Sequence, residues 1–165
     1  MTNETIQKKL TEKFGDVLTD WQEPYGMLTF SAHKDFNLKV LQFLFDDESL
    51  NFRFLTDLQA VHYPDRKGEE LAVVYHLHNL SDNVRIRFKV FLDIQNPSVF
   101  SATALYQSAN FMERETYDFF GVNFVGHPNL IRILNVDEMD YFPMRKEFPL
   151  EDQSRVDKDD DMFGR

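Results

Sequence analysis

The chain has 165 residues, a formal net charge of −10 at pH 7, no cysteine and 17 phenylalanines. This length accommodates one domain with a real core plus a peripheral extension, and the acidity disfavours nucleic acid or an anionic membrane surface as the main partner. Without cysteine the chain cannot form disulfides, cysteine zinc sites or cysteine-ligated iron–sulfur clusters, so we expect it to hold no cluster by itself.

Targeting and membrane-spanning patterns are missing from the sequence. No run of about 18 or more apolar residues is present. Residues 1–14 lack both the apolar core of a signal peptide and the acid-poor composition of a transit peptide. We therefore expect the chain to stay in the cytoplasm.

The N-terminal part predicts a helix followed by a hairpin. Ile6 and Leu10 recur at the spacing of one helical face, and Gly15 stands where a helix commonly ends. The strand-like runs 17–21 and 27–32 follow, separated by a Pro- and Gly-containing turn. This order favours two strands packed beside a short amphipathic helix.

The middle of the chain continues the alternation of helix and strand. Helical periodicity covers 35–46, and a strand is expected within 51–64. Segments 71–80 and 84–93 predict a hairpin, because apolar residues alternate with Arg and Lys in the second of them. A third helix is expected over 98–120. Together these elements predict a two-layer α+β sandwich, with a mixed sheet packed by helices, over residues 1–120.

Residues 113–150 are densely apolar and aromatic, yet most of this stretch keeps neither helical nor strand periodicity. We divide the remainder of the chain into an extended partner-binding arm, 121–150, and an acidic mobile tail, 151–165. Two interpretations of the arm stay open: a segment clamped against a partner protein, or a long loop folded back over its own domain. The apolar side chains in and before the arm that favour burial are Phe119, Phe120, Phe124, Ile131, Ile133, Leu134, Tyr141, Phe142 and Phe148.

A dense charge cluster precedes the arm. It contains Glu113, Arg114, Glu115 and Asp118. One hypothesis is electrostatic: Arg114 pairs with carboxylates, and the other residues bind backbone donors or partner cations where the arm departs. The alternative is a metal site or acid–base pair in which Glu115 and Asp118 act together with His127.

Other chemical signals are weak. The glycines are too widely spaced for a phosphate-binding loop, and no serine stands between glycines as a nucleophile elbow requires. His76 and His78 share a strand face, without carboxylates at metal-ligand spacing nearby. The acidic run 157–161 lacks the glycine and terminal glutamate of a calcium loop. Arg145 and Lys146 could form a basic clamp for an acidic partner site or a solvated charge pair.

Several sequence blocks, in order, closely resemble the C subunit of proton-pumping NADH-quinone oxidoreductase, respiratory complex I, the 30 kDa subunit family. The resemblance covers residues 30–150. The blocks that carry it are FLTDL (54–58), VYHL (74–77), NVRIRFKV (83–90), ERETYDFFG (113–121), FVGHPNLIRIL (124–134) and RKEFPL (145–150). The chain departs from the family's usual residues at His62, Phe111, Ile131 and Phe142.

The resemblance implies a non-catalytic scaffold subunit of the peripheral arm of a bacterial complex I. Such a subunit packs against the D subunit, which helps to form the quinone site, and supports electron transfer from NADH to quinone coupled to proton translocation. It lies on the cytoplasmic side of the cell inner membrane, and the NADH, FMN, iron–sulfur clusters and quinone belong to the complex as a whole, not to this chain.

The residues expected to bind the partner come from the charge cluster, the helix end and the arm. They are Glu113, Arg114, Glu115, Asp118, Phe119, Phe120, His127, Arg132, Arg145 and Lys146. No catalytic, cofactor-binding or metal-binding residue is expected. Two alternative functions stay open: a subunit of a related membrane-bound hydrogenase, and a small stand-alone metal-dependent enzyme.

Overall fold

The computed structural model describes residues 1–149, so the predicted acidic tail 151–165 lies outside the described residues. Three α-helices, three short 3-10 helices and seven strands are present in this range. The α-helices are α1 (Asn3–Phe14), α2 (Asn37–Asp46) and α3 (Ala109–Phe120). The strands are β1 (Leu18–Gln22), β2 (Leu28–Ala32), β3 (Phe54–His62), β4 (Leu71–Asn79), β5 (Val84–Leu92), β6 (Ser98–Phe100) and β7 (Asn123–Val125).

The first helix forms where its sequence predicts. The Thr2 hydroxyl caps its N-terminus by accepting a hydrogen bond from Thr5 N at 3.3 Å, and Ile6 and Leu10 are fully buried. Gly15 ends it with a positive φ of 54°. Lys9 then joins α1 to the end of α2 through the Asp47 carboxylate at 2.9 Å.

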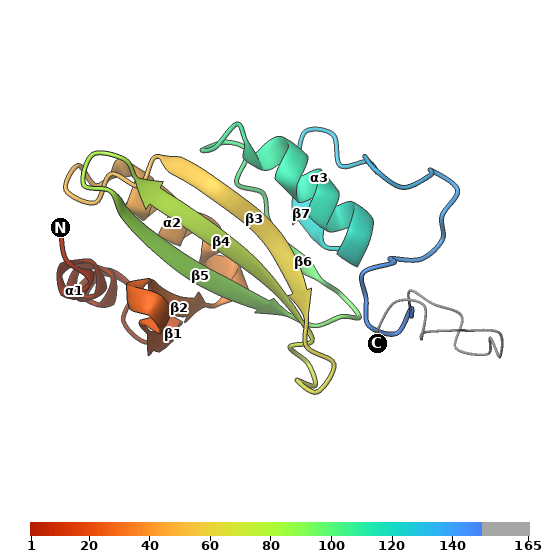
Figure 1. Cartoon of the computed structure of the whole chain (residues 1–165), viewed down its shortest axis with the longest axis horizontal. Helices are drawn as coiled ribbons and strands as arrows, with labels where there is room; N and C mark the ends of the chain where they lie inside the picture. The colour runs from red at the N-terminus through yellow and green to blue at the C-terminus, as the bar shows by residue number, and fades with distance from the viewer. Residues whose placement is uncertain (150–165) are drawn as a thin grey trace, which may run out of the picture.

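The main sheet has five strands in the order β1-β2-β5-β4-β3 (Figure 1). Strands β2 and β5 are parallel, and the other neighbours are antiparallel. The sheet is therefore mixed, and the predicted α+β sandwich is confirmed. The hairpin of β4 and β5 keeps an unbroken register from Leu71 opposite Leu92 to Asn79 opposite Val84.

The two faces of the sheet differ in composition. Aromatic rings cross the inner face, where Tyr75 and Phe88 stack at 4.5 Å and Phe88 and Phe30 at 5.5 Å. The main core cluster joins this face to buried residues of α1, α2 and α3. Figure 1 shows α2 behind β4 and β5. The outer face carries Arg and Lys side chains of β5, as the alternation in this strand requires.

The third helix is shorter than predicted, which corrects the expected span 98–120. Residues Ser98–Phe100 form strand β6, which pairs in parallel with β7. Turns occupy 101–108, and α3 begins only at Ala109. The sequence 98–120 favoured helix locally, but pairing with β7 and burial of Val99 give the first residues a better-stabilised extended conformation.

The arm folds back toward α3 after β7. In Figure 1 it extends beside α3 in blue and returns to the C-terminal end of that helix. It contains turns and irregular backbone from Gly126 to Pro149. The backbone of the arm is thus tied to its own domain, while many of its apolar side chains face outward. The interpretation that a partner protein clamps the arm stays a prediction.

Candidate functional site

Asp118 is the attachment point of the arm. Its side chain is fully buried near the C-terminal end of α3. Oδ2 accepts hydrogen bonds from three consecutive backbone amides, those of Ile133, Leu134 and Asn135, at 3.0, 2.8 and 2.9 Å. Oδ1 accepts from the side chains of Arg132 at 2.7 Å and Asn135 at 3.0 Å. One carboxylate therefore fixes four successive residues of the arm.

The environment of Asp118 favours its ionised form. Burial alone raises the pKa of a carboxyl group, because the charged form loses its hydration. The hydrogen bonds from the backbone amides of Asn135 and Leu134 and from the side chains of Arg132 and Asn135 outweigh this effect. The pKa of Asp118 is therefore held well below its usual range, and the carboxylate is charged at neutral pH.

Arg132 extends the attachment from α3 to a more distant part of the arm. Its Nη1 also donates to the Asp118 carbonyl oxygen at 2.9 Å. Its Nη2 donates to the carbonyl oxygens of Met139 and Tyr141 at 2.7 and 3.1 Å. Because the guanidinium has several donors in a fixed plane, one side chain can join a helix end and two turns of the arm.

Phe142 packs over the end of α3. A Cβ atom built on Gly121 would lie 2.5 Å from the Phe142 ring, so the glycine provides the space for this contact, and its φ of 76° also favours glycine. The guanidinium carbons of Arg132 and Arg145 lie 5.3 and 4.7 Å from the ring centroid. The edge of Tyr117 completes the surroundings at 6.1 Å.

The last described turn of the arm is also tied down. Arg145 Nε donates to the Phe120 carbonyl at 2.8 Å, and Met144 N donates to the Phe119 carbonyl at 3.2 Å. Lys146 N donates to His62 Nδ1 at 3.0 Å, which requires a neutral ring nitrogen. Burial lowers the pKa of His62, in agreement with this role. We call Asp118, Arg132, Phe142 and Arg145 together the clasp.

The clasp leaves apolar side chains of the arm in solvent. Twelve large apolar residues are exposed among those described, and six of them lie within 131–148. This concentration is unusual for a surface that faces only water. The six, which we call the apolar strip, are Ile131, Leu134, Val136, Tyr141, Met144 and Phe148.

Glu113 lies apart from the clasp although it shares a helix with Asp118. Its side chain is fully buried and accepts hydrogen bonds from Ser101 Oγ at 2.7 Å and Ala102 N at 2.6 Å. Burial raises the pKa of Glu113 to about 7, and these two hydrogen bonds reduce the effect only in part. Glu113 thus fixes the turns before α3. Any part it has in partner binding would be indirect.

The remaining residues of the charge cluster make different contacts from those expected. Arg114 donates to the carbonyl oxygens of Ile131 and Arg132 at 3.2 and 3.1 Å. The expectation that Arg114 pairs with carboxylates is wrong within the part of the chain that the structure describes. Glu115 is exposed on the outer side of α3. Arg114 therefore contacts the arm through backbone groups.

His127 supports the arm through its backbone neighbours. Its Nε2 lies 3.0 Å from the Asn110 carbonyl, and its Nδ1 accepts a hydrogen bond from Asn129 N at 3.0 Å. This pair of contacts assigns the proton to Nε2. The proposed metal site of Glu115, Asp118 and His127 does not form, because no group of three His, Asp or Glu in residues 1–149 could hold an ion.

The structure therefore brings Asp118, Phe119, Phe120, Arg132 and Arg145 together and places Lys146 beside them through its backbone. The prediction that the ten residues bind a partner stays a prediction. Sequence reasoning missed Gly121, Phe142 and Asn135 as parts of the attachment. A signal was available for Gly121, since a glycine after a helix marks a left-handed residue, but nothing in the sequence indicated which ring would cover it.

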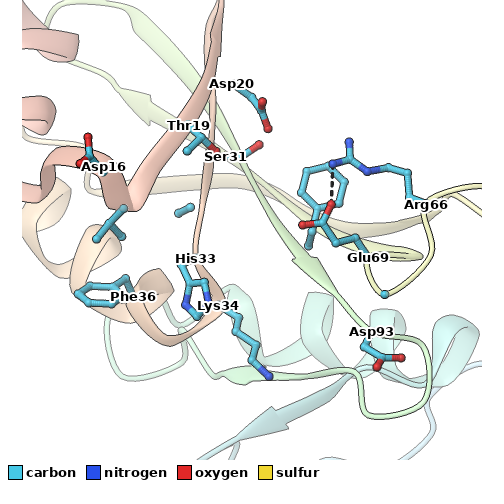
Figure 2. Close-up of a pocket in the computed structure, with 14 residues that line it drawn as sticks. Asp16, Thr19, Asp20, Ser31, His33, Lys34, Phe36, Arg66, Glu69 and Asp93 are labelled. Atoms are coloured by element: carbon cyan, nitrogen blue, oxygen red, sulfur yellow. Dashed lines mark hydrogen bonds and ion pairs between the residues drawn. The ribbon is translucent and has the colours of Figure 1, made fainter.

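A surface hollow of about 690 Å³ is lined by residues of β1, β2, the β3–β4 loop and the end of β5 (Figure 2). Asp16, Asp20 and Asp93 line it, and Arg66 and Glu69 form an ion pair of 2.7 Å across its wall. The lining has more carboxylates than basic side chains, so the hollow is acidic although Arg66 and Glu69 pair with each other. Among the described residues, no helix is long and apolar enough to span a bilayer.

Comparison with known proteins identifies relatives over most of the chain. The family described as "Respiratory-chain NADH dehydrogenase, 30 Kd subunit" matches residues 30–154. The C subunit of NADH-quinone oxidoreductase from Citrifermentans bemidjiense is 44% identical over 147 residues, which are 89% of each chain. That of Nocardioides sp. is also 44% identical, over 125 residues, and the match spans 76% of this chain but half of the relative.

Solved structures share the fold. The trypsin-resistant fragment (1–134) of Nqo5 superimposes with a TM-score of 0.67 at 29% identity, covering 79% of this chain and all of the fragment. A polypeptide of the membrane-bound sulfane sulfur reductase, an archaeal respiratory membrane complex, gives a TM-score of 0.76 at 26% identity over 96% of both chains. The resemblance expected from the sequence is confirmed.

Proposed function

From the premise that this chain belongs to the respiratory-chain NADH dehydrogenase 30 kDa subunit family, we propose that it is a non-catalytic scaffold subunit of the peripheral arm of a bacterial NADH-quinone oxidoreductase. Its task is to hold neighbouring subunits in position while they transfer electrons from NADH to quinone and the complex translocates protons. The protein lies on the cytoplasmic side of the inner membrane. NADH, FMN, iron–sulfur clusters and quinone bind elsewhere in the complex.

The apolar strip is the observation that carries this proposal. A buried carboxylate and two arginines fix the irregular arm, yet six large apolar side chains on it stay exposed. Such a fixed and exposed apolar surface is typical of a protein–protein contact. Pre-organisation reduces the entropy lost on association, because the arm need not be ordered when the partner binds. We propose that the strip is covered by the D subunit of the same complex.

Two observations weigh against the alternatives. The relatives that match over most of their length are C subunits of NADH-quinone oxidoreductase, which disfavours a hydrogenase even though the fold also occurs in another respiratory membrane complex. The stand-alone metal enzyme loses its basis, since Asp118 is occupied by the arm and His127 by backbone groups.

Co-expression of the tagged chain with the D subunit of its own complex tests the proposal. The double variant Leu134→Asp, Val136→Asp places two charges in the strip, and we expect it to weaken the complex by about 30-fold or more, which corresponds to about 2 kcal/mol. Leu80→Asp is the matched control, because Leu80 and Leu134 are both 64% exposed but Leu80 lies in the β4–β5 turn. Biolayer interferometry measures both affinities.

An equal loss of affinity in the strip variant and in Leu80→Asp would show that the apolar strip is not the surface that binds the D subunit. Failure of the unmodified chain to bind the D subunit at all would remove the assignment of that partner.

A further inference from the structure

The outer face of the sheet carries a row of cations on a chain whose formal net charge is −10. Arg85, Arg87 and Lys89 occupy alternate positions of β5, between residues whose side chains enter the core. We call these three residues the cationic stripe. Over residues 1–149, none of the three is in an ion pair with an Asp or Glu.

The stripe lies in the interior of the sheet and not at its edge. Arg87 stands between Thr29 of β2 and His76 of β4, and Lys89 stands between Ser31 and Val74. These neighbours are short or neutral. Val74 is not part of the main core cluster. This agrees with the position of the helices on the opposite face of the sheet from the stripe.

The polar atoms of the stripe are incompletely satisfied. Arg87 Nη2 donates to Thr29 Oγ1 at 3.2 Å, but its Nε is buried and has no hydrogen-bond partner among the described atoms. Partial burial lowers the pKa of Lys89, and the charges of Arg87 and Arg66 lower it further, while the Asp20 carboxylate opposes this only in part. Burying unpaired like charges costs free energy, which an anionic group placed on this face would offset.

The spacing of the stripe fits an extended peptide. Side chains on one face of a strand recur about every 6.8 Å, so three cations at alternate positions match three carboxylates at alternate positions of another extended segment. We propose that the outer face of the sheet is a docking site for an extended acidic segment of a neighbouring polypeptide, with its carboxylates paired to Arg85, Arg87 and Lys89. This site is separate from the arm and does not depend on the arm's partner.

A long polyanion fits this face less well than a short acidic segment. Asp57 is paired with His76 on the neighbouring strand, with its carboxylate 3.7 Å from the His76 ring. At the Lys89 end, the hollow of Figure 2 presents Asp16, Asp20 and Asp93. These carboxylates and the net charge of the whole chain repel nucleic acid and anionic lipid surfaces. A short acidic segment that contacts only the stripe stays clear of these carboxylates.

Titration of the full chain with labelled peptides tests the proposal. The first probe is an eight-residue peptide of alternating Thr and Glu; the second has the same composition with four Thr followed by four Glu. We expect the alternating peptide to bind about fivefold more tightly in fluorescence anisotropy, and added salt to weaken it. In the unmodified chain, amide chemical shifts should change along β5 and its two neighbouring strands.

The double variant Arg87→Gln, Lys89→Gln should reduce the affinity for the alternating peptide about tenfold, because each lost ion pair can lower the affinity by up to about fivefold. Lys8→Gln with Lys13→Gln is the matched control, because it removes two charges from the exposed face of α1 and should leave the affinity unchanged. Equal binding of the two peptides, shift changes away from β5, or tighter binding of octathymidine or phosphatidylglycerol vesicles than of the alternating peptide would overturn the proposal.

Discussion

In the sandwich, β2, β4 and β5 bury their apolar side chains and β5 carries its charges on the outer face, whereas in the arm the main buried contacts are polar and six large apolar side chains face outward. The first arrangement stabilises a domain by itself, since apolar burial is the main favourable contribution to folding. The second cannot do so, and it needs charged hydrogen bonds to hold an irregular backbone in place. The difference supports the proposal that the arm contacts another molecule.

Two buried carboxylates on α3 show the same difference at the scale of single residues. Glu113 faces the sandwich and accepts two hydrogen bonds, so burial prevails and its pKa rises to about 7. Asp118 faces the arm, and its five hydrogen-bond contacts, one of them to Arg132, outweigh burial. The hydrogen-bond donors around each carboxylate, with the charge of Arg132 at Asp118, therefore decide how far it is ionised near neutral pH.

The largest effect is expected from Asp118→Asn. This change removes the charge that holds the arm and with it the difference between the arm and the sandwich. Arg132 would lose its carboxylate, and three backbone amides would face a group with only one acceptor oxygen. We expect a loss of about 3–5 kcal/mol in the free energy of unfolding or in the docking of the arm. Denaturant unfolding and limited proteolysis of residues 126–149 measure the two.

Glu115→Gln is the control for this variant, because it removes an exposed carboxylate from the same helix. Proteolysis of the arm at the same rate in Asp118→Asn and Glu115→Gln would contradict the assignment of Asp118 as the attachment point.

The next effect concerns pH and sharpens the contrast between the two carboxylates. The folded pKa of Glu113, about 7, exceeds its ordinary value of 4.5, so its contribution to stability is complete below about pH 4.5 and is lost as the pH rises through 7. This loss amounts to about 3 kcal/mol. The pKa of Asp118 is lowered, so its contribution is present at neutral pH and is lost only as the pH falls below about 4.

Urea unfolding at pH 5 and pH 8 measures the contribution of Glu113. In Glu113→Gln the difference in unfolding free energy between these two pH values should shrink by most of this amount, because the amide does not titrate. An unchanged pH dependence in the variant would show that Glu113 is not the titrating group.

The smallest effect is expected from Gly121→Ala, which tests the packing of Phe142. Both Gly121 and Gly68 have positive φ, 76° and 81°, but a Cβ at Gly121 meets Phe142 at 2.5 Å while a Cβ at Gly68 meets nothing within 4 Å. Gly68→Ala should cost about 1 kcal/mol from backbone strain alone. Gly121→Ala should cost about 1–2 kcal/mol more, as the ring is displaced. Thermal unfolding measures the loss of stability in the two variants, and equal losses would contradict the contact between Gly121 and Phe142.

Local patterns in the sequence predicted the sandwich because its residues repeat with a period. The cap of α1, the alternation in β5 and the hairpin turn before Val84 each fix an element without reference to distant residues. Strands β6 and β7 were missed because each is only three residues long and depends on the other, 25 positions away, for its hydrogen bonds. The local preference for helix over 98–108 therefore gave the wrong start for α3.

The arm was recognisable from its composition but not from its geometry. Its apolar content without periodicity predicted an irregular segment that needs burial. The contacts of the clasp join residues 14 to 25 positions apart, such as Asp118 with Arg132 and Phe120 with Arg145, and no sequence repeat predicts such pairs. Charge type also misled the assignment of Arg114, which binds backbone carbonyls and not carboxylates. The clasp depends on which backbone groups the fold leaves without partners, and these are known only once the chain is folded.

Hydroxyl-radical footprinting of the apolar strip, in the free chain and in the purified respiratory complex, tests most directly whether the arm is fixed by its own domain and covered by a partner. We expect Leu134, Tyr141 and Met144 to be oxidised readily in the free chain and strongly protected in the complex. Equal oxidation of these three side chains in both states would contradict the account, because the strip would then remain in solvent throughout.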